Sequence, residues 1–559
     1  MVFLSSPRSG ALNFMALSKK HWCFVIIFLL AIWVAAHLPG IFYGTDLVPL
    51  HMSYIGDEQS PVNGALHILR DKSLFALRDL PTVYYGPLFS VVALPAVIAD
   101  FSVKYITGVV SGADDYRDFI LWDWGGIIIW SRLLALIAGL FGIIGFYKLL
   151  SRPFANPSLG RLAPFVGSSL LALNFYYFEY SHFFKHWIFI LTFLVWELYA
   201  IARILEKDEN TSRFWFLAWT MTVLSFGVSY LGALFQIVWL PVLWHFVKAR
   251  YRPSLMRFLA YATGSLFSFA AIVAWHPRAF FRILGITGGD IADADISSFT
   301  NEAAVSGLSY GYYASMLFVN HISLIALITV LCEYLWYKNK FPRHILISGI
   351  ALSLLAYSLV FGLFGHHESR YILPLIFFIT FLAGVIIGHF LSFEEKNRLV
   401  LVSSITLVLF TVIFHVAHIG RFMFITMQGP PERAAIEKIV SLEKNDEVSK
   451  TLFVKDYLFG YVHTKDAYRD YAEKFNKSGF NLYKAILNTV PPQSISPIRV
   501  YYTRTTEPLP KGAWRTYKRI GYHYDPRFAG LLEPDFMETR LVNLWFYKDF
   551  SDKYSFLKQ

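Results

Sequence analysis

Long apolar stretches alternate with short polar segments over roughly the first three quarters of the chain, and this pattern predicts about eleven membrane-spanning helices. Each expected span approaches the ~20 apolar residues needed to cross the hydrocarbon core of a bilayer. The expected spans are residues 22–41, 124–148, 162–178, 187–205, 214–227, 231–247, 258–275, 312–335, 345–365, 371–391 and 399–418. We expect the first span to be retained, because no small-residue cleavage site follows it.

Another apolar run, at residues 88–103, is shorter than these spans, contains Pro95 and has Asp100 near its end. If this run crossed the membrane, the basic loops that follow it would lie outside, against the usual bias of Lys and Arg toward the cytoplasm. We therefore expect it to lie along the outer membrane surface as a juxtamembrane helix. The N-terminus and the basic loops are then cytoplasmic, and polar segments 43–123, 179–186, 276–311 and 366–370 lie outside.

The pattern changes from about Gly429 onward, where Pro430 and Pro431 follow the last span. A helix-like period covers residues 434–440, and runs of β-branched and aromatic residues at 451–454, 498–502 and 541–547 predict strands. The chain is thus expected to be an α-helical multi-pass membrane protein in two parts. Residues 1–428 form the transmembrane domain, including a first outer loop at 43–123 with juxtamembrane helices, and residues 429–559 form a small α/β soluble domain on the outer side.

Composition agrees with a membrane protein, since 55% of the 559 residues are hydrophobic and the mean hydropathy is +0.46. The net charge of +11 comes largely from basic loops beside the spans, so it indicates membrane topology and no nucleic-acid partner. Cys23 and Cys332 both lie in apolar stretches, which excludes a disulfide framework and a thiolate metal site.

Two adjacent acids, Asp57 and Glu58, follow the first span in the first outer loop, directly before a helix-like segment. Carboxylates at that position either cap the helix and complement its dipole or serve acid–base chemistry. Further along the same loop, Tyr85 precedes Gly86 and Pro87, where the juxtamembrane helix is expected to begin.

Polar side chains also gather between two expected spans in the segment that contains Glu179, His182, Lys185 and His186. Lys185 as a point charge, with both histidines as hydrogen-bond donors, could bind a lipid phosphate. The alternative is that Lys185 snorkels at the interface beside aromatic anchors. The density of polar groups favours a binding role.

A third cluster consists of His366, His367, Glu368 and Arg370 at the start of a late span. An Arg on the outer side is not needed for orientation and indicates an anionic ligand, whereas adjacent histidines on a tight turn seldom bind one metal ion. Arg132, inside its span, either binds an anion or snorkels outward.

The segment 276–311 carries four acids among glycines and serines, which leaves both a metal site and a flexible gate open. These acids are Asp290, Asp293, Asp295 and Glu302.

These motifs, in this order, resemble the GT-C superfamily of membrane glycosyltransferases. The resemblance is to the branch of protein O-mannosyltransferases and lipid A aminoarabinose transferases, and it covers most of the membrane domain. The matching motifs are Asp57-Glu58, the Pro-containing juxtamembrane helix, Arg132-Leu133, Tyr180-Ser181-His182, Trp275-His276-Pro277 and Arg370-Tyr371-Ile372-Leu373-Pro374. Two positions depart from the family pattern, because Tyr85 stands where relatives often have Lys and Trp187 where they often have Asp.

The resemblance implies an inverting transfer of a sugar from a polyprenyl-phosphate donor to a hydroxyl acceptor. Asp57 and Glu58 would be the catalytic residues, with Asp57 as the base and Glu58 capping the following helix or positioning the acceptor. The implied contacts to the donor phosphate are Lys185, His182, Arg370 and Arg132. Implied acceptor or auxiliary residues are Glu179, His186, His366, His367, Glu368 and Tyr85.

Partners expected from this resemblance are the polyprenyl-phosphate sugar, a lipid, glycan or protein acceptor, and membrane lipids. The resemblance requires no cofactor, and it leaves open whether a divalent metal cation takes part. The expected location is the cell membrane with the site on the outer face, or the endoplasmic reticulum membrane in a eukaryote. The alternatives are a secondary transporter, a non-catalytic protein that handles lipid-linked glycans, and a scaffold that presents the C-terminal domain. The absence of a visible repeat and the gathering of polar clusters at one membrane face favour the enzyme over the transporter.

Overall fold

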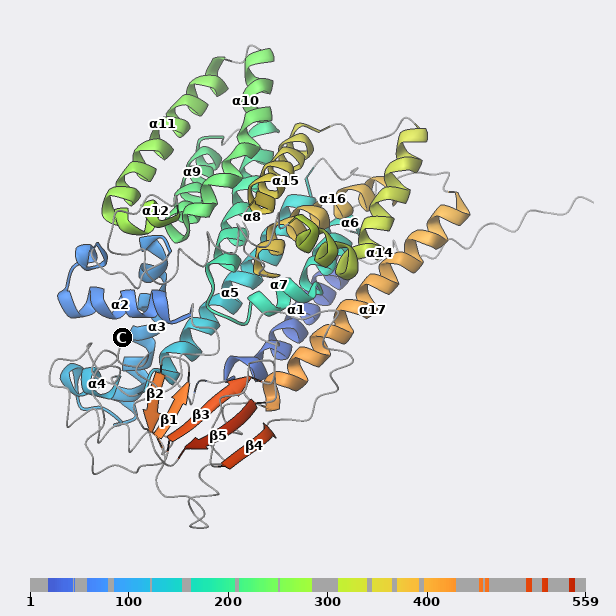
Figure 1. The fold of residues 1–559 in the computed structure, drawn as a ribbon. Coiled ribbons are helices and arrows are strands. Elements are labelled where there is room, and N and C mark those ends of the chain that lie inside the picture. Colours follow the sequence, from blue (N-terminus) through green and yellow to red (C-terminus); the bar gives the residue numbers. More distant parts are fainter. Residues whose placement is uncertain are drawn as a thin grey trace, which may run out of the picture.

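The computed structural model describes most of residues 19–428 and five short segments beyond them. The described residues are 19–43, 45, 58–78, 85–120, 123–152, 162–206, 211–249, 252–283, 310–338, 344–363, 369–391, 397–428, 452–455, 458–461, 499–504, 515–520 and 542–547. Helices dominate this part of the chain (Figure 1).

In the membrane domain the described helices are, in chain order, α1 (Lys19–Ile41), α2 (Gln59–Asp71), η4 (Leu74–Leu77), α3 (Pro87–Ile106), α4 (Ala113–Phe119), α5 (Gly125–Leu150), α6 (Leu162–Ala172), α7 (Phe175–Tyr180), α8 (His186–Leu205), α9 (Thr211–Val228), η6 (Tyr230–Val238), α10 (Trp239–Lys248), α11 (Arg252–Trp275), α12 (Pro277–Ile283), α14 (Tyr310–Tyr337), α15 (Ile345–Leu363), η7 (Ser369–Ile372), α16 (Leu373–Leu391) and α17 (Arg398–Gln428).

Every range expected to span the membrane falls on a helix of the structure or on two consecutive ones. Three of the expected spans are divided: one between α6 and α7, one between η6 and α10, and one between η7 and α16. By length and apolar composition alone, eight helices among the described residues could cross a bilayer, and α3 is one of the eight. The fold is therefore that of a multi-pass α-helical membrane protein, as the sequence predicts.

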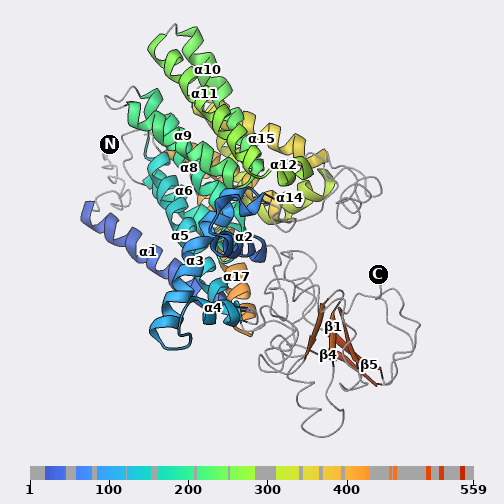
Figure 2. The same cartoon turned by 90° about the vertical axis from the view of Figure 1, so that its left-hand side faces the viewer.

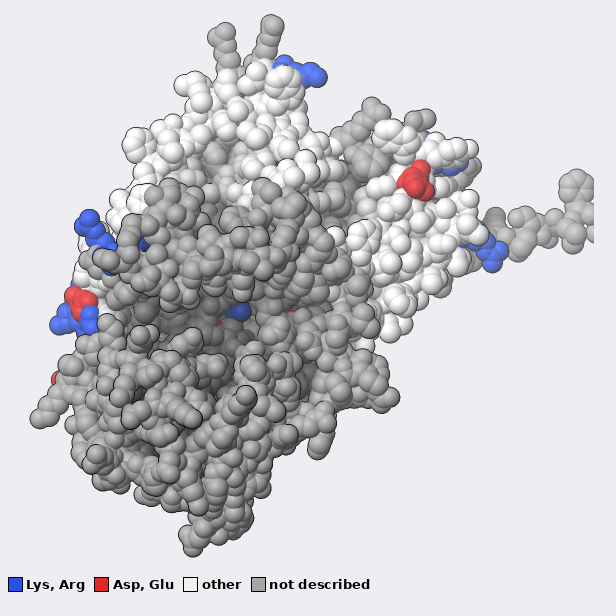
Figure 3. All heavy atoms as spheres, in the orientation of Figure 1, with Lys and Arg blue, Asp and Glu red and all other residues white. Residues whose placement is uncertain are grey.

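The outside of the bundle is apolar, which agrees with lipid contact. Phe216, Phe267 and Ile413 expose 66%, 72% and 67% of their side chains, an arrangement that is unfavourable in water. Figure 3 shows a described surface that is largely free of charge, with Lys, Arg, Asp and Glu mostly near its edges.

Both ends of α3 lie at the same end of the helix bundle. Near its start, Gly86 N–H donates to the Val228 carbonyl at the end of α9 (3.1 Å), and Phe89 stacks on Phe184 just before α8 (4.8 Å). Near its other end, Asp100 lies against Gly126 at the start of α5. Because α9 ends here and α5 and α8 begin here, α3 crosses the ends of these helices instead of running beside them.

We call this side of the molecule the first-loop end, defined as the end where α1 and α9 finish and α5 and α8 begin. Its position on the outer side of the membrane is a prediction from the charge pattern. The placement of α3 agrees with the juxtamembrane position expected for residues 88–103, although its 20 residues are long enough to cross. Figure 1 likewise shows the neighbouring α2 lying transverse to α10 and α11.

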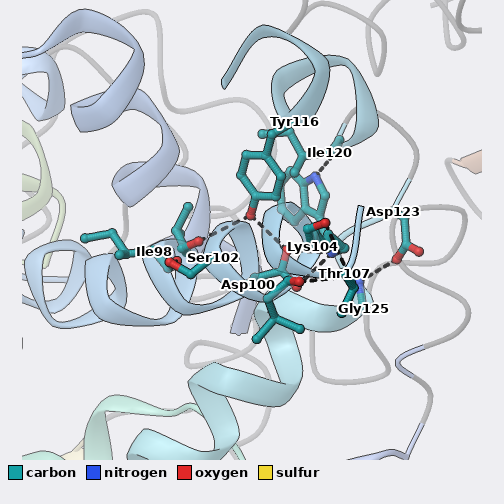
Figure 4. A network of polar contacts seen from close by, with 12 residues as sticks. Ile98, Asp100, Ser102, Lys104, Thr107, Tyr116, Ile120, Asp123 and Gly125 are labelled. Atoms are coloured by element: carbon teal, nitrogen blue, oxygen red, sulfur yellow. Dashed lines mark hydrogen bonds and ion pairs between the residues drawn. The ribbon is translucent and has the colours of Figure 1, made fainter. Parts of the chain in front are cut away.

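A polar network fastens α3 to α4 (Figure 4). The Lys104 ammonium contacts both oxygens of Asp100 (2.7 and 2.6 Å), and the Tyr116 hydroxyl donates to Asp100 Oδ2 (2.8 Å). Asp100 is 3% exposed, so these donors supply the hydrogen bonds that its buried carboxylate requires.

The middle of the bundle is built around α8, which packs between α5 and α9. Its Glu197 is fully buried and accepts hydrogen bonds from Thr222 Oγ1 (2.8 Å), Gln236 Nε2 (3.2 Å) and Trp239 Nε1 (2.8 Å). This carboxylate thus joins α8, α9, η6 and α10 where water does not supply hydrogen bonds.

The C-terminal segments form a five-stranded mixed sheet of order β2-β1-β3-β5-β4. The strands are β1 (Leu452–Lys455), β2 (Leu458–Tyr461), β3 (Arg499–Arg504), β4 (Arg515–Ile520) and β5 (Val542–Tyr547). Only β1 and β3 pair in parallel. The three predicted strands are confirmed, β2 and β4 were not predicted, and the helix expected at 434–440 lies outside the described residues. Figure 2 shows strands of this sheet, in brown to dark red, with β1, β4 and β5 labelled.

Candidate functional site

The turn of residues 181–185, between α7 and α8, is the centre of the candidate site at the first-loop end. Asn174 begins α7 by accepting hydrogen bonds from the backbone amides of Tyr176 (3.1 Å) and Tyr177 (3.4 Å), the usual role of an N-cap. After α7 ends at Tyr180, the turn leads into α8 at His186. Four of the predicted site residues therefore lie in or beside one short segment: Glu179, His182, Lys185 and His186.

Glu58 and Arg132, both predicted as site residues, form a buried ion pair. Arg132 Nε donates to Glu58 Oε1 (3.0 Å) and Nη2 donates to Oε2 (2.8 Å). The side chain of Arg132 is 1% exposed and that of Glu58 is 0% exposed. Such a two-point contact between a guanidinium and a carboxylate fixes orientation as well as distance.

Glu58 also bonds the turn, because its Oε1 accepts the Phe184 backbone N–H (2.8 Å). It occupies the N-cap position of α2, yet its side chain makes no capping hydrogen bond. The capping role considered for Glu58 is therefore wrong, because its carboxylate oxygens accept hydrogen bonds from Arg132 and from the Phe184 N–H instead. The pairing could not be predicted from the sequence, in which Glu58 and Arg132 are 74 positions apart.

Arg132 points into the protein and not outward to the membrane surface. Its Nη1 donates to the carbonyls of Ile41 (3.0 Å) and Tyr43 (2.7 Å) at the end of α1, and its guanidinium lies 5.2 Å from the Phe183 ring centre. The guanidinium donors therefore go largely to protein groups. The expectation that Arg132 snorkels outward is wrong, and its contacts indicate a positioning role.

His182 packs inside the turn against the end of α1. Its ring stacks on His37 at 4.1 Å, and a side chain at Gly40 would collide with it, since an added Cβ would lie 2.4 Å from His182 Cδ2. Burial above all, with His37 and Arg132 nearby, lowers the pKa of His182 well below its usual value, so the ring is neutral at pH 7.

The sequence predicts that His182 donates a hydrogen bond to a lipid phosphate, and the neutral, buried ring differs from that expectation. Its Nδ1 lies 3.1 Å from the Phe178 carbonyl, which can only accept, so Nδ1 carries the proton and Nε2 a lone pair. Among the described residues Nε2 has no hydrogen-bond partner. His37, which the sequence analysis missed, is the neighbour that stacks on this ring, and its place as a polar residue inside an apolar span was the available signal.

Lys185 ends the turn and His186 begins α8, and both side chains are buried. Lys185 is 8% exposed and His186 is 4% exposed. The Lys185 ammonium lies 5.7 Å from the centre of the Tyr180 ring, and the His186 ring lies 4.2 Å from that of Tyr85. The structure thus brings Tyr85 to this segment, as the prediction of a shared site requires, although the two lie about 100 positions apart in the sequence.

Of the late cluster, the structure describes only the backbone of Arg370, in η7. The adjoining Tyr371 packs edge-on against Trp187 at 5.5 Å, so η7 lies beside the start of α8. Asp57, His366, His367 and Glu368 lie outside the described residues, as do the acids at 290, 293, 295 and 302. Within the described part of the chain, no group of three His, Cys, Asp or Glu residues could hold a metal ion.

No protein-family model matches the chain, and no curated protein matches its sequence. Among solved structures, it is similar to the crystal structure of ArnT from Cupriavidus metallidurans bound to undecaprenyl phosphate. That match has 12% identity and a TM-score of 0.48, and covers 94% of this chain and 98% of the other. The apo structure of the same protein matches with 10% identity and a TM-score of 0.44, covering 86% and 94%.

Proposed function

We propose that the chain is an inverting glycosyltransferase. It moves a sugar from a polyprenyl-phosphate-linked donor to a hydroxyl group of an acceptor at the first-loop end, on the outer face of the membrane. The observation that carries this proposal is the bonding of Glu58 to both Arg132 and the Phe184 amide. These contacts hold Glu58, which follows Asp57 in the sequence, at the turn that carries Lys185.

Asp57 is the proposed base. As the acceptor hydroxyl attacks the anomeric carbon, its proton passes to the Asp57 carboxylate, and the bond between that carbon and the phosphate oxygen breaks. Attack from the side opposite the leaving phosphate inverts the anomeric centre. Glu58 and Arg132 are assigned here as positioning residues, because their charged groups bind each other.

The leaving polyprenyl phosphate gains negative charge on its bridging oxygen, and cations stabilise it. Lys185, in the turn, and Arg370, in the neighbouring η7, are the proposed phosphate contacts. His182 and His37 support the turn from within, while Tyr85, Glu179 and His186 border the same region. The proposed donor suits a membrane surface, because its lipid tail remains among the lipids while its phosphate meets the turn.

A secondary transporter is the alternative that experiment must separate from this proposal. Purified full-length protein in lipid nanodiscs would be given undecaprenyl-phosphate-linked sugars together with a membrane extract as acceptor source. Mass spectrometry would follow the release of undecaprenyl phosphate. We expect release with a lipid-linked donor and none with a nucleotide sugar. Uptake of intact lipid-linked sugar into proteoliposomes, without any release of undecaprenyl phosphate, would contradict the proposal.

A further inference from the structure

A groove lies between α9 and α11, away from the turn that forms the candidate site. It encloses about 310 Å³ and is lined by Ser212, Trp215, Phe216, Trp219, Arg257, Ala260, Tyr261 and Gly264. Figures 1 and 2 both place α11 at the periphery of the bundle, beside α9 and α10. The volume is at the lower end of the range for small-molecule sites, which is about 300–1,000 Å³.

The groove is made by two matching helical stripes. Its residues on α9 recur at positions 212, 215, 216 and 219, and those on α11 at 257, 260, 261 and 264. This spacing places each set on one face of its helix. At a rise of 1.5 Å per residue, each stripe extends about 10 Å along the helix axis. The groove is therefore elongated parallel to the helices, the direction in which a lipid chain lies in a bilayer.

The charged residue of the groove, Arg257, lies toward the end where α9 and α11 begin. Arg257, five residues into α11, bonds the hydroxyl of Thr211 and makes no ion pair with another described residue. The indole N–H groups of Trp215 and Trp219 likewise have no hydrogen-bond partner among the described residues. Both indole nitrogens are buried, and that of Trp219 lies beside Gly264 at the other end of the groove. Arg257 is thus the cation at one end of a largely apolar groove.

The far end and the floor of the groove are largely apolar. Gly264 and Ala260 leave room where larger side chains would fill the space, and Phe216 exposes 66% of its side chain at the rim. The Tyr261 hydroxyl is turned away into the buried network around Glu197, where it contacts Thr222 (2.7 Å) and Gln236 (3.0 Å).

We propose that this groove binds an anionic phospholipid, with its phosphate at Arg257 and one acyl chain along the apolar stripe toward Gly264. The arrangement of a cation at a helix end above an aromatic and apolar stripe matches the order of groups in a phospholipid. Exposed Arg213 and Lys248 at the same end of the neighbouring helices add positive charge, which favours a lipid of net negative charge over a zwitterionic one.

Native mass spectrometry of the full-length protein in detergent tests this proposal. The protein would be titrated with phosphatidylglycerol and, separately, with phosphatidylcholine. We expect one tight phosphatidylglycerol site. Arg257→Gln should weaken that site by about tenfold, because it removes a charged hydrogen-bond donor.

Arg117→Gln is the matched control, because Arg117 is an exposed cation in α4 at the first-loop end, away from the start of α9 and α11, and does not line the groove. It should leave phosphatidylglycerol affinity unchanged. Gly264→Leu, which fills the groove, should abolish the site and decides the question if the Arg257 variant does not fold. Unchanged phosphatidylglycerol affinity in folded Arg257→Gln or Gly264→Leu protein would overturn the proposal. Displacement of the lipid by inorganic phosphate alone would also overturn it, because it would indicate a site for a free anion.

Discussion

At the scale of single residues, the buried pair of Glu58 and Arg132 is the feature with the clearest consequences. It links four parts of the chain: the end of α1, the start of α2, α5 and the turn before α8. A buried ion pair is costly to break by removing one partner, because the other charge then remains without compensation. The pair therefore tests whether Glu58 positions the site or acts in the chemistry.

Glu58→Gln should destabilise the protein by about 3–5 kcal/mol, since it leaves the Arg132 charge buried and uncompensated. The measurement is the temperature at which the purified protein unfolds in detergent. Asp71→Asn is a matched control, because Asp71 ends the same helix and pairs with Arg70 at an exposed site (37% exposed). That change should cost at most about 1 kcal/mol.

A different outcome would assign Glu58 to the chemistry. If Glu58→Gln unfolded at the wild-type temperature and lost sugar transfer completely, then Glu58 would act as the base and the positioning role would be wrong.

The sequence analysis found the residue types of the site but not their partners. The Asp57-Glu58 pair, Arg132 and the polar segment around Lys185 each stand out because charged groups are expensive beside apolar spans. Which of them bind each other depends on how α1, α2, α5 and α8 pack, and no local pattern contains that information. The protonation of His182 is also invisible in the sequence, because it follows from burial against His37.

At the scale of elements, the turn between α7 and α8 supplies the proposed phosphate contact. Lys185→Ala should weaken the binding of undecaprenyl phosphate by about 1.5–3 kcal/mol, the value for a charged hydrogen bond. Calorimetry with the purified protein would measure this. Lys148→Ala is the control, because Lys148 lies exposed at the opposite end of α5. Equal affinity in wild type and Lys185→Ala would remove Lys185 from the donor site.

The position of α3 is the second prediction at this scale. Ser111 is exposed just after α3, so a cysteine placed there reports which side the end of the helix occupies. If α3 crosses the ends of the bundle, Ser111→Cys in intact cells should react with a membrane-impermeant maleimide added outside. Reaction only after the cytoplasmic side is opened would mean that α3 spans the membrane, or that the whole orientation is reversed.

The elements themselves were largely predictable, because apolar runs of about 20 residues leave few alternatives to a spanning helix. The divisions within these spans could not be predicted. The break between α6 and α7 at Leu173 and Asn174, and the 3₁₀ turn of η6 before α10, interrupt stretches that are mostly apolar. Strands β2 and β4 were missed because Leu458–Tyr461 is short and Arg515–Ile520 is largely polar.

At the scale of the whole molecule, the charge pattern predicts that the first-loop end and the C-terminal domain lie on the same side of the membrane. A cysteine at Ser478, in the C-terminal domain, should therefore be labelled from outside in the same cells as Ser111→Cys. The predicted topology has an odd number of spans between a cytoplasmic N-terminus and the C-terminal domain. Labelling of the two positions from opposite sides would contradict it.

Two lipid contacts are proposed at different places, one for the donor at the turn before α8 and one for a phospholipid between α9 and α11. They rest on different residues and can fail separately. Loss of the phospholipid site would leave the proposed transfer chemistry unaffected, since Arg257 and Gly264 do not contact the turn of residues 181–185 among the described residues.

The central claim is that Asp57 takes the acceptor proton, and turnover by Asp57→Asn protein tests it most directly. Asn caps helices about as well as Asp, so the change spares a purely structural role. We predict that sugar transfer falls by about a hundredfold or more, as general-base loss does, while undecaprenyl phosphate affinity and the unfolding temperature remain at wild-type values. Transfer by purified Asp57→Asn at close to the wild-type rate would contradict the account.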